Sequence, residues 1–315
     1  MAHLALLKLA LALAFSSSAS AAFNVSNLVS SDAVLQRGKP NTVWGYTNDT
    51  AAVIAATWVD DVVYSSAPAS GGVWRVTFPA APASSAPFDL AFTSSAGGAP
   101  ATLERLLVGD VFLCAGQSNM GAVQVSAMWN VSEILAHAVA LQPVLRIMQV
   151  SGNLQSPVPL DAWPTSGLVP WQPPLGVDGN TTGPLLGFSA VCFIMGSTLA
   201  DEHLAGRVPV GLIHSSHGGT SIQAWASPEG AAQCGDNSNS WNTSVLYNSI
   251  STRSPSARRR LRAFTGTRAS RSVFSFSLSL SLSLFLAPFL PPLRHSPCFA
   301  RAPPQPLTGR GHWLV

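Results

Sequence analysis

Charged residues are scarce in this chain, making up 10% of its 315 residues, whereas apolar residues make up 47%. Such a composition excludes a solvated, disordered chain and leaves enough apolar side chains for a core in roughly two domains. The four cysteines are too few for a disulfide-rich scaffold, and three of them precede Ile250, so this part can form at most one internal bridge. None lies in a C-x-x-C pair or another cluster with ligand spacing, so the sequence predicts no metal site.

Acidic residues are absent after Ile250, where the chain contains ten of its seventeen Lys and Arg residues, all of them Arg. The net charge of +3 therefore combines an acidic body with a basic end. Because the body is acidic, we expect no nucleic-acid partner. The alternative hypothesis, that the protein binds nucleic acid or a membrane surface, is supported only by the basic end of the chain.

Long hydrophobic runs are also absent, and the apolar stretch Leu4 to Phe15, which contains Lys8, is too short for a membrane span. Together with the small residues Ala19-Ser20-Ala21, this stretch predicts a signal peptide over residues 1–22, although an anchor or a buried first helix is the alternative. Five N-x-[ST] sequons indicate a glycoprotein of the secretory pathway, extracellular or lysosome-like: Asn24, Asn48, Asn130, Asn180 and Asn242.

The rest of the chain divides into three regions by its pattern. Residues 23–103 contain short β-rich runs separated by turn formers, which predicts a small β-sandwich or jelly-roll-like module. Residues 104–250 alternate buried-strand patterns with a helical pattern over 188–205, which predicts an α/β region with a parallel sheet covered on both faces. Residues 251–315 are rich in Arg, Ser and Pro, with alternating Ser and Leu over 275–284, and we expect a disordered, low-complexity tail. We hypothesise that this tail arises from a retained intron or a shifted reading frame.

A first candidate site follows the apolar strand pattern that ends in Cys114-Ala115-Gly116-Gln117-Ser118-Asn119. Gly116 permits a tight turn, and Ser118 then lies where a helix can begin, at the edge of the sheet where α/β proteins build their sites. Ser118 is the candidate nucleophile, with Gly116, Gln117 and Asn119 in support. The alternative is that Ser118 is only a helix N-cap.

A second candidate site follows the next strand pattern, where Gly218 and Gly219 end a buried run and precede Trp225. A glycine pair lets the backbone approach a ligand closely and offer its N–H groups. An ordinary strand-to-helix turn is the alternative interpretation.

These two stretches together resemble the sialate O-acetylesterase family of the SGNH hydrolases, which carries G-D-V-W-L-C-x-G-Q-S-N-M and P-x-G-L-I-x-S-S-W-G-G-T blocks. Further similarities extend the resemblance over residues 23–250, among them Val34-Leu35-Gln36-Arg37. The resemblance implies a three-layer SGNH-type parallel sheet after the β module. It also implies acyl transfer through Ser118, with the oxyanion held by the N–H groups of Ser118, Gly218 and Gly219 and by an Asn side chain.

The resemblance implies that the substrate is an O-acetyl ester of sialic acid or of a related acetylated glycan. It implies no need for a metal or an organic cofactor. Trp225 could contact the sugar. Trp163 and Trp171 are further candidates for stacking on sugar faces, although core packing is the favoured interpretation for each of the three tryptophans taken alone. The sequence says nothing of the oligomeric state.

Two elements of the family are missing from this chain: the later block with the oxyanion Asn, and the D-x-x-H element that supplies the base. We therefore expect the C-terminal part to be truncated or aberrant. The sheet would then be incomplete, with an open apolar edge, and the chain would fold poorly. We also expect little hydrolysis, since losing a triad member costs about 10⁴ to 10⁶ in rate. His214 and His217 could replace the base, but polar loop histidines are the favoured interpretation. A catalytically inactive glycan-binding protein is the alternative function.

Overall fold

The computed structural model describes residues 23–58, 61–150, 154–160, 162–180, 182–203, 205–233, 243–250 and 262–265. The predicted signal peptide, residues 1–22, lies outside the described residues, as do Asn242 and most of the predicted tail.

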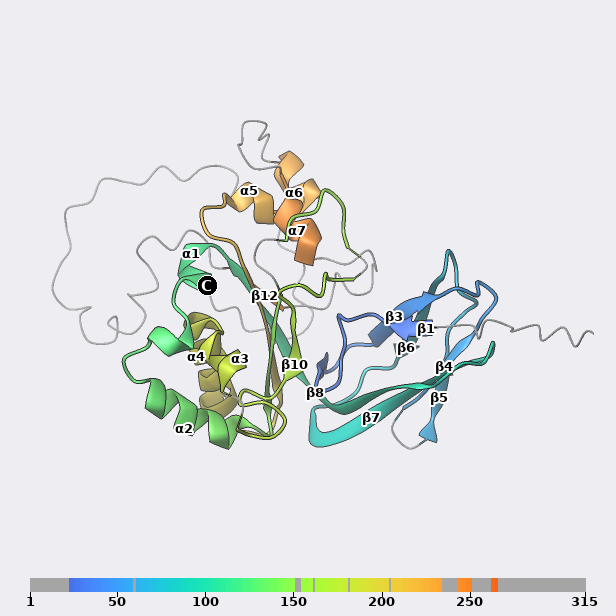
Figure 1. Cartoon of the computed structure of the whole chain (residues 1–315), viewed down its shortest axis with the longest axis horizontal. Helices are drawn as coiled ribbons and strands as arrows, with labels where there is room; N and C mark the ends of the chain where they lie inside the picture. Colours follow the sequence, from blue (N-terminus) through green and yellow to red (C-terminus); the bar gives the residue numbers. More distant parts are fainter. Residues whose placement is uncertain are drawn as a thin grey trace, which may run out of the picture.

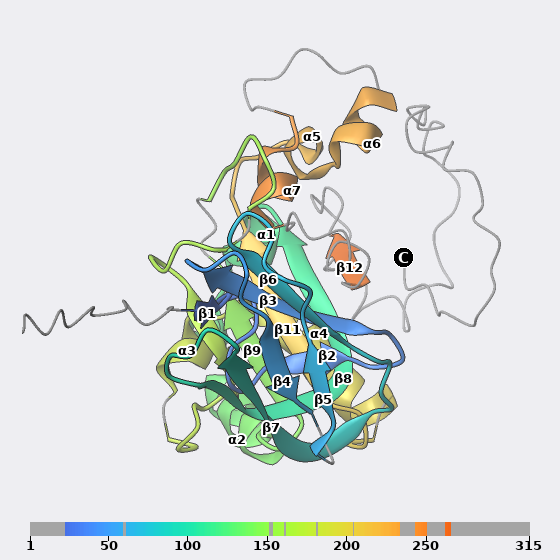
Figure 2. The same cartoon turned by 90° about the vertical axis from the view of Figure 1, so that its right-hand side faces the viewer.

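The N-terminal part consists of two facing sheets (Figures 1 and 2). One contains β1 (Phe23–Val25), β3 (Asn41–Thr47) and β6 (Val73–Phe78), all antiparallel. The other contains β4 (Ile54–Thr57), β5 (Val63–Ser65) and β7 (Ser84–Ser94). Every second residue of β6 is buried, so Trp74, Val76 and Phe78 point into the core between the sheets. The predicted N-terminal β module is present.

Strand β8 (Ala101–Gly116) is the longest element and belongs to both halves of the molecule (Figure 1). Its first half pairs antiparallel with β7, and Leu107–Gly109 pair in parallel with β2 (Val34–Gln36). Its second half pairs in parallel with β11 (Val210–Ser216). The strand therefore crosses the boundary that the sequence predicts between residues 103 and 104, and the two regions share one strand.

The α/β class is confirmed, but the sheet is of mixed orientation. The order is β10-β9-β11-β8, in which β9 (Leu145–Gln149), β11 and β8 are parallel. Strand β10 (Val169–Gln172) is antiparallel to β9. The parallel strands are buried on both faces, which explains their continuous apolar sequence.

Helices cover one face of this sheet. The helices there are α2 (Val131–Leu141), α3 (Gly183–Leu186) and α4 (Ala190–Thr198), the last continued by the π-helical turn η3 (Leu199–His203), and the short turn η2 (Val125–Ala127) precedes α2. The other face packs on Trp163, Trp171 and Ile250 together with the core of the β module. The helices α5 (Ile222–Trp225), α6 (Pro228–Gln233) and α7 (Val245–Ile250) lie beyond the carboxyl end of β11 (Figure 1).

Strand β12 (Arg262–Thr265) corrects the prediction made for the tail. These four residues pair in parallel with Phe112–Ala115 of β8, on a chain segment that the sequence predicts to be disordered. The open edge expected beside the parallel strands is therefore covered along this part of β8. Ladder hydrogen bonds to a distant strand leave no periodicity signal in a segment of four residues, so the sequence pattern missed them.

A buried aspartate joins β2 to β8. The two oxygens of Asp110 accept hydrogen bonds from Arg37 Nε at 3.0 Å and Nη2 at 2.8 Å, and Gln36 Nε2 donates to Oδ1 at 3.2 Å. The Asp110 side chain is 5% exposed, whereas that of Arg37 is 36% exposed. A bidentate pair of this kind is strong because its two hydrogen bonds replace the hydration that the carboxylate loses on burial.

Replacing Asp110 with Ala is expected to lower the free energy of unfolding by about 2–3 kcal/mol, because it leaves Arg37 and Gln36 without their buried acceptor. Urea unfolding followed by circular dichroism measures this loss. The matched control is Glu104→Ala, which removes an exposed ion pair with Arg105 and is expected to cost under about 1 kcal/mol. Equal losses in the two variants would contradict the role of Asp110.

Candidate active site

Ser118 is the first residue of the short helix α1 (Ser118–Gly121), two residues after the end of β8. Gln117 occupies the N-cap position, and no side chain caps this helix, so the alternative interpretation of Ser118 as the N-cap is wrong. Ser118 and Asn119 are exposed, whereas Gly116 and Gln117 are half-buried. Among the described residues, the Ser118 hydroxyl makes no hydrogen bond, so it is presented to solvent without an activating partner.

The glycine loop lies directly beside Ser118. Strand β11 ends with Ser216 in register with Gly116 of β8, and the backbone N–H of His217 donates to the Gly116 carbonyl at 2.9 Å. A Cβ atom built on Gly218 would lie 4.0 Å from both Cα and Cβ of Ser118. The two stretches that the sequence singles out, about 100 residues apart, are thus brought together because parallel neighbouring strands end at the same edge of the sheet.

Thr220 holds the glycine loop in shape. Its hydroxyl donates to the His217 carbonyl at 2.8 Å and accepts from Trp225 Nε1 at 2.9 Å. Gly219 has a φ of +76°, which favours glycine at this turn. Trp225 is half-buried and its ring nitrogen is occupied by Thr220, so what it presents near the loop is ring surface rather than a free donor.

Trp163 and Trp171 are not available to a sugar. They are 6% and 5% exposed and belong to the hydrophobic core, and Trp163 Nε1 donates to the Ser249 carbonyl at 2.9 Å. The favoured interpretation, core packing, is therefore confirmed for both, and stacking on a sugar is excluded because an indole packed in a core has no face left for a ligand.

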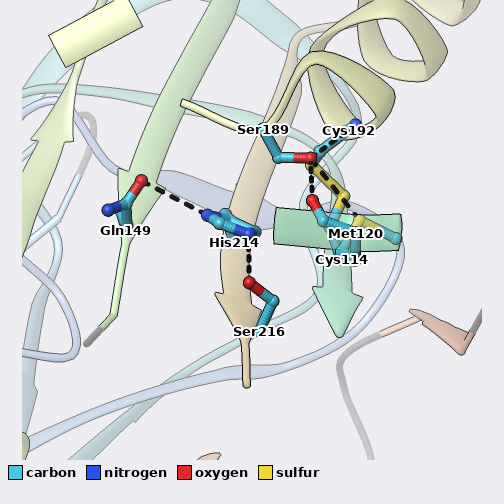
Figure 3. The surroundings of a disulfide bond; sticks show 7 residues. All are labelled: Cys114, Met120, Gln149, Ser189, Cys192, His214 and Ser216. Atoms are coloured by element: carbon cyan, nitrogen blue, oxygen red, sulfur yellow. Dashed lines mark hydrogen bonds between the residues drawn. A yellow bond between two sulfur atoms is a disulfide. The ribbon is translucent and has the colours of Figure 1, made fainter. Parts of the chain in front are cut away.

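A disulfide anchors the strand that leads to Ser118 (Figure 3). Cys114 of β8 is bonded to Cys192 in the first turn of α4, and both cysteines are buried. Beside it, Ser189 Oγ donates to the Met120 carbonyl of α1 at 2.5 Å and accepts from Cys192 N at 3.2 Å. The beginning of α4 is thus tied to both elements that flank Ser118.

His214 is a buried strand residue and not a polar loop residue as expected. It lies in β11, is 7% exposed, and its ring packs edge-on against Phe188. Nδ1 lies 3.2 Å from Gln149 Oε1 and Nε2 lies 3.0 Å from Ser216 Oγ (Figure 3). Burial lowers the pKa of His214 to about 4, because the apolar surroundings disfavour the charged imidazolium. The apolar residues directly before His214 in the sequence could have predicted its burial.

Other kinds of site find no support in the described part of the chain. Within it, no group of three or more His, Cys, Asp or Glu side chains could hold a metal ion. No helix in the same residues is long and apolar enough to cross a membrane.

Comparisons with known proteins agree with this architecture. Residues 108–264 match the family model described as carbohydrate esterase, sialic acid-specific acetylesterase. The chain is 33% identical to a mouse (Mus musculus) sialate O-acetylesterase over 230 residues and 32% identical to the human (Homo sapiens) one over 235 residues. These alignments cover 70% and 69% of this chain but 40% and 41% of those proteins, so the chain spans about two fifths of their length.

A solved structure is also similar. The crystal structure of a carbohydrate acetylesterase from Xanthomonas citri aligns with a TM-score of 0.58 at 29% identity, covering 72% of this chain and 47% of that one. The fold and the family model together place the chain among the carbohydrate esterases. More narrowly, the chain belongs to the sialate O-acetylesterase family.

The Cys114–Cys192 bond is expected to contribute about 4 kcal/mol to stability, because it closes a loop with a sequence separation of 78 residues. Replacing both cysteines with Ala should lower the midpoint of urea unfolding accordingly. Each single replacement serves as the control and should give a similar loss, since either one removes the bond. A double variant as stable as the parent protein would contradict this role.

His214 makes stability depend on pH. Its pKa of about 4 in the folded state lies below the ordinary histidine value of 6.5, so the unfolded chain binds the proton more tightly. Its contribution is complete above pH 6.5 and is lost as the pH falls towards 4, a loss of about 3 kcal/mol.

Thermal unfolding measured between pH 7 and pH 4 tests this dependence. His214→Gln should flatten the decline relative to the parent protein, because it removes the buried group whose pKa is lowered. An unchanged decline in the His214 variant would show that another group causes it.

Proposed function

We propose that this chain carries the nucleophile and the oxyanion-binding backbone of a carbohydrate O-acetylesterase site. The observation that carries the proposal is the position of exposed Ser118 beside Gly218 at the common end of β8 and β11. Such an arrangement suits acyl transfer, since a hydroxyl and backbone N–H groups can face the same ester carbonyl.

In this proposal the Ser118 oxygen attacks the acetyl carbonyl and loses its proton as the new C–O bond forms. The N–H groups of Ser118, Gly218 and Gly219 stabilise the negative charge on the carbonyl oxygen. The sugar alcohol then leaves with a proton, and water releases acetate from the serine. The Thr220 hydrogen bonds supply the rigidity, because amides that are already oriented need no reorganisation during the reaction.

We propose an O-acetylated sialic acid, or a related acetylated glycan, as the substrate. The relatives support it, since the mouse and human proteins are named sialate O-acetylesterases and the bacterial structure is of a carbohydrate acetylesterase. The half-buried ring of Trp225 beside the glycine loop offers a surface for the sugar.

A secretory location is proposed as well. The buried Cys114–Cys192 bond supports it, because structural disulfides persist in oxidising compartments. Sequon asparagines Asn24, Asn48 and Asn180 are exposed, so a glycan at any of them could extend into solvent.

The unpartnered hydroxyl of Ser118 favours low activity, because no hydrogen bond among the described residues withdraws its proton. We expect slow, Ser118-dependent acetate release from O-acetylated sialic acid, because a serine nucleophile without its base loses about 10⁴ to 10⁶ in rate. Release is measured by enzymatic assay of free acetate on the full chain. Ser118→Ala should abolish it, and Ser126→Ala, at an exposed serine of η2, is the matched control.

The same hydroxyl also favours a second function, a glycan-binding protein without catalysis. In that case the sugar would bind with equal affinity to the parent chain and to Ser118→Ala, and neither would release acetate. Calorimetric titration with the deacetylated and acetylated sugar measures this binding. Acetate release that is lost in Ser118→Ala would favour the esterase over the glycan-binding protein.

A further inference from the structure

Ser216, His214 and Gln149 form a hydrogen-bonded row across the ends of β11 and β9 (Figure 3). Ser216 Oγ is 3.0 Å from His214 Nε2, and His214 Nδ1 is 3.2 Å from Gln149 Oε1. A hydroxyl within reach of an imidazole that a third group orients is the arrangement of an activated nucleophile. We propose that Ser216 and His214 form a second nucleophile–base pair, oriented by Gln149, which accepts small acyl groups independently of Ser118.

The hydrogen bonds define the protonation of the ring. Gln149 Oε1 can only accept, so Nδ1 carries the ring proton and donates it. In the neutral ring Nε2 is then an acceptor, and the Ser216 hydroxyl must donate to it. Burial keeps His214 neutral at neutral pH, so Nε2 is free to accept a proton, but the lowered pKa also makes it a weak base, which agrees with a slow reaction.

Access to Ser216 limits the size of the acyl group. Ser216 is half-buried at the strand end, whereas the neighbouring Ser215 is 3% exposed. Helix α1 packs against the hydroxyl, since a Cβ atom built on Gly121 would lie 2.2 Å from Ser216 Oγ. A side chain at position 121 would therefore collide with the Ser216 hydroxyl, and the backbone of α1 crowds this oxygen on that side. We accordingly expect a small acyl group such as acetyl to react more readily than a longer acyl chain or a sugar ester.

The reaction is an acyl transfer in two steps. Ser216 Oγ bonds to the acyl carbon while its proton passes to His214 Nε2, and the leaving oxygen departs with that proton. Water then attacks the acyl-serine with His214 as the base, which regenerates the hydroxyl and releases the acid. Gln149 orients the ring but, as a neutral amide, cannot neutralise the imidazolium, so the step is slow and suits an activated ester.

The test uses the full chain with Ser118→Ala, produced through a secretory host so that the disulfide forms. The protein is incubated with p-nitrophenyl acetate, quenched in acid, and the acetylated residue is identified by fragmentation mass spectrometry. We expect an acetyl group on Ser216. His214→Gln should slow acetylation about a hundredfold, and p-nitrophenyl butyrate should react more slowly than the acetate ester.

Two further variants keep the test independent of folding losses. Gln149→Glu places a carboxylate beside Nδ1 and is expected to raise the acetylation rate about tenfold, which a damaged fold would not do. Ser215→Ala, at the buried neighbour, should leave the rate unchanged.

The proposal is overturned by either of two results. One is the absence of an adduct on Ser216 in a Ser118→Ala protein whose thermal unfolding matches the parent. The other is an adduct on Ser216 that forms at the same rate in the Ser118→Ala parent and in its His214→Gln and Gln149→Glu variants. Because Ser118 is absent throughout, neither result bears on the proposed esterase site.

Discussion

The continuity of strand β8 is the constraint on which the rest of the structure depends. One half of the strand pairs with β7 of the β module, and the other half lies between β11 and β12 in the parallel part of the sheet. One hydrophobic core accordingly contains Trp74 and Phe92 of the module together with Leu113 and Ile213 of the parallel sheet. The two regions cannot separate without exposing this shared surface to water, which is unfavourable by roughly 25 cal/mol for each Å² of apolar area.

The candidate site lies at the carboxyl end of the same strand. Ser118 follows β8 by two residues, and the orientation of that end is set by the disulfide to α4 and by the Ser189 hydrogen bonds. On the neighbouring strand, Thr220 sets the shape of the glycine loop. Around Ser118 the described part of the fold therefore supplies backbone in a rigid position, which in the proposed site would stabilise a developing charge without removing a proton.

Activation and access are divided between two serines of this edge. Ser118 is exposed beside the glycine amides but lacks a base among the described residues, whereas Ser216 has a base but lies against Gly121. An efficient hydrolase needs both properties at one oxygen. This division gives a physical reason for expecting slow chemistry at each serine.

The sequence by itself determined what depends on neighbours along the chain. Alternating residues predicted the β module, and continuous apolar runs predicted β8 and β11. The polar residues after those runs marked two candidate sites, and the resemblance to the esterase family implied that Ser118 and Gly218 belong to one. Those predictions succeed because strand periodicity is local and because parallel neighbouring strands end at one edge.

Only the tertiary structure decided the contacts between distant positions. It paired Asp110 with Arg37, joined Cys114 to Cys192, added β12 beside β8, and buried His214 between Gln149 and Ser216. Apart from His214 and Ser216, which are two residues apart on β11, the partners lie on separate segments and leave no mark on local periodicity. Burial and hydrogen bonding arise from packing in three dimensions, so the environment of a polar side chain becomes known only when the fold is complete.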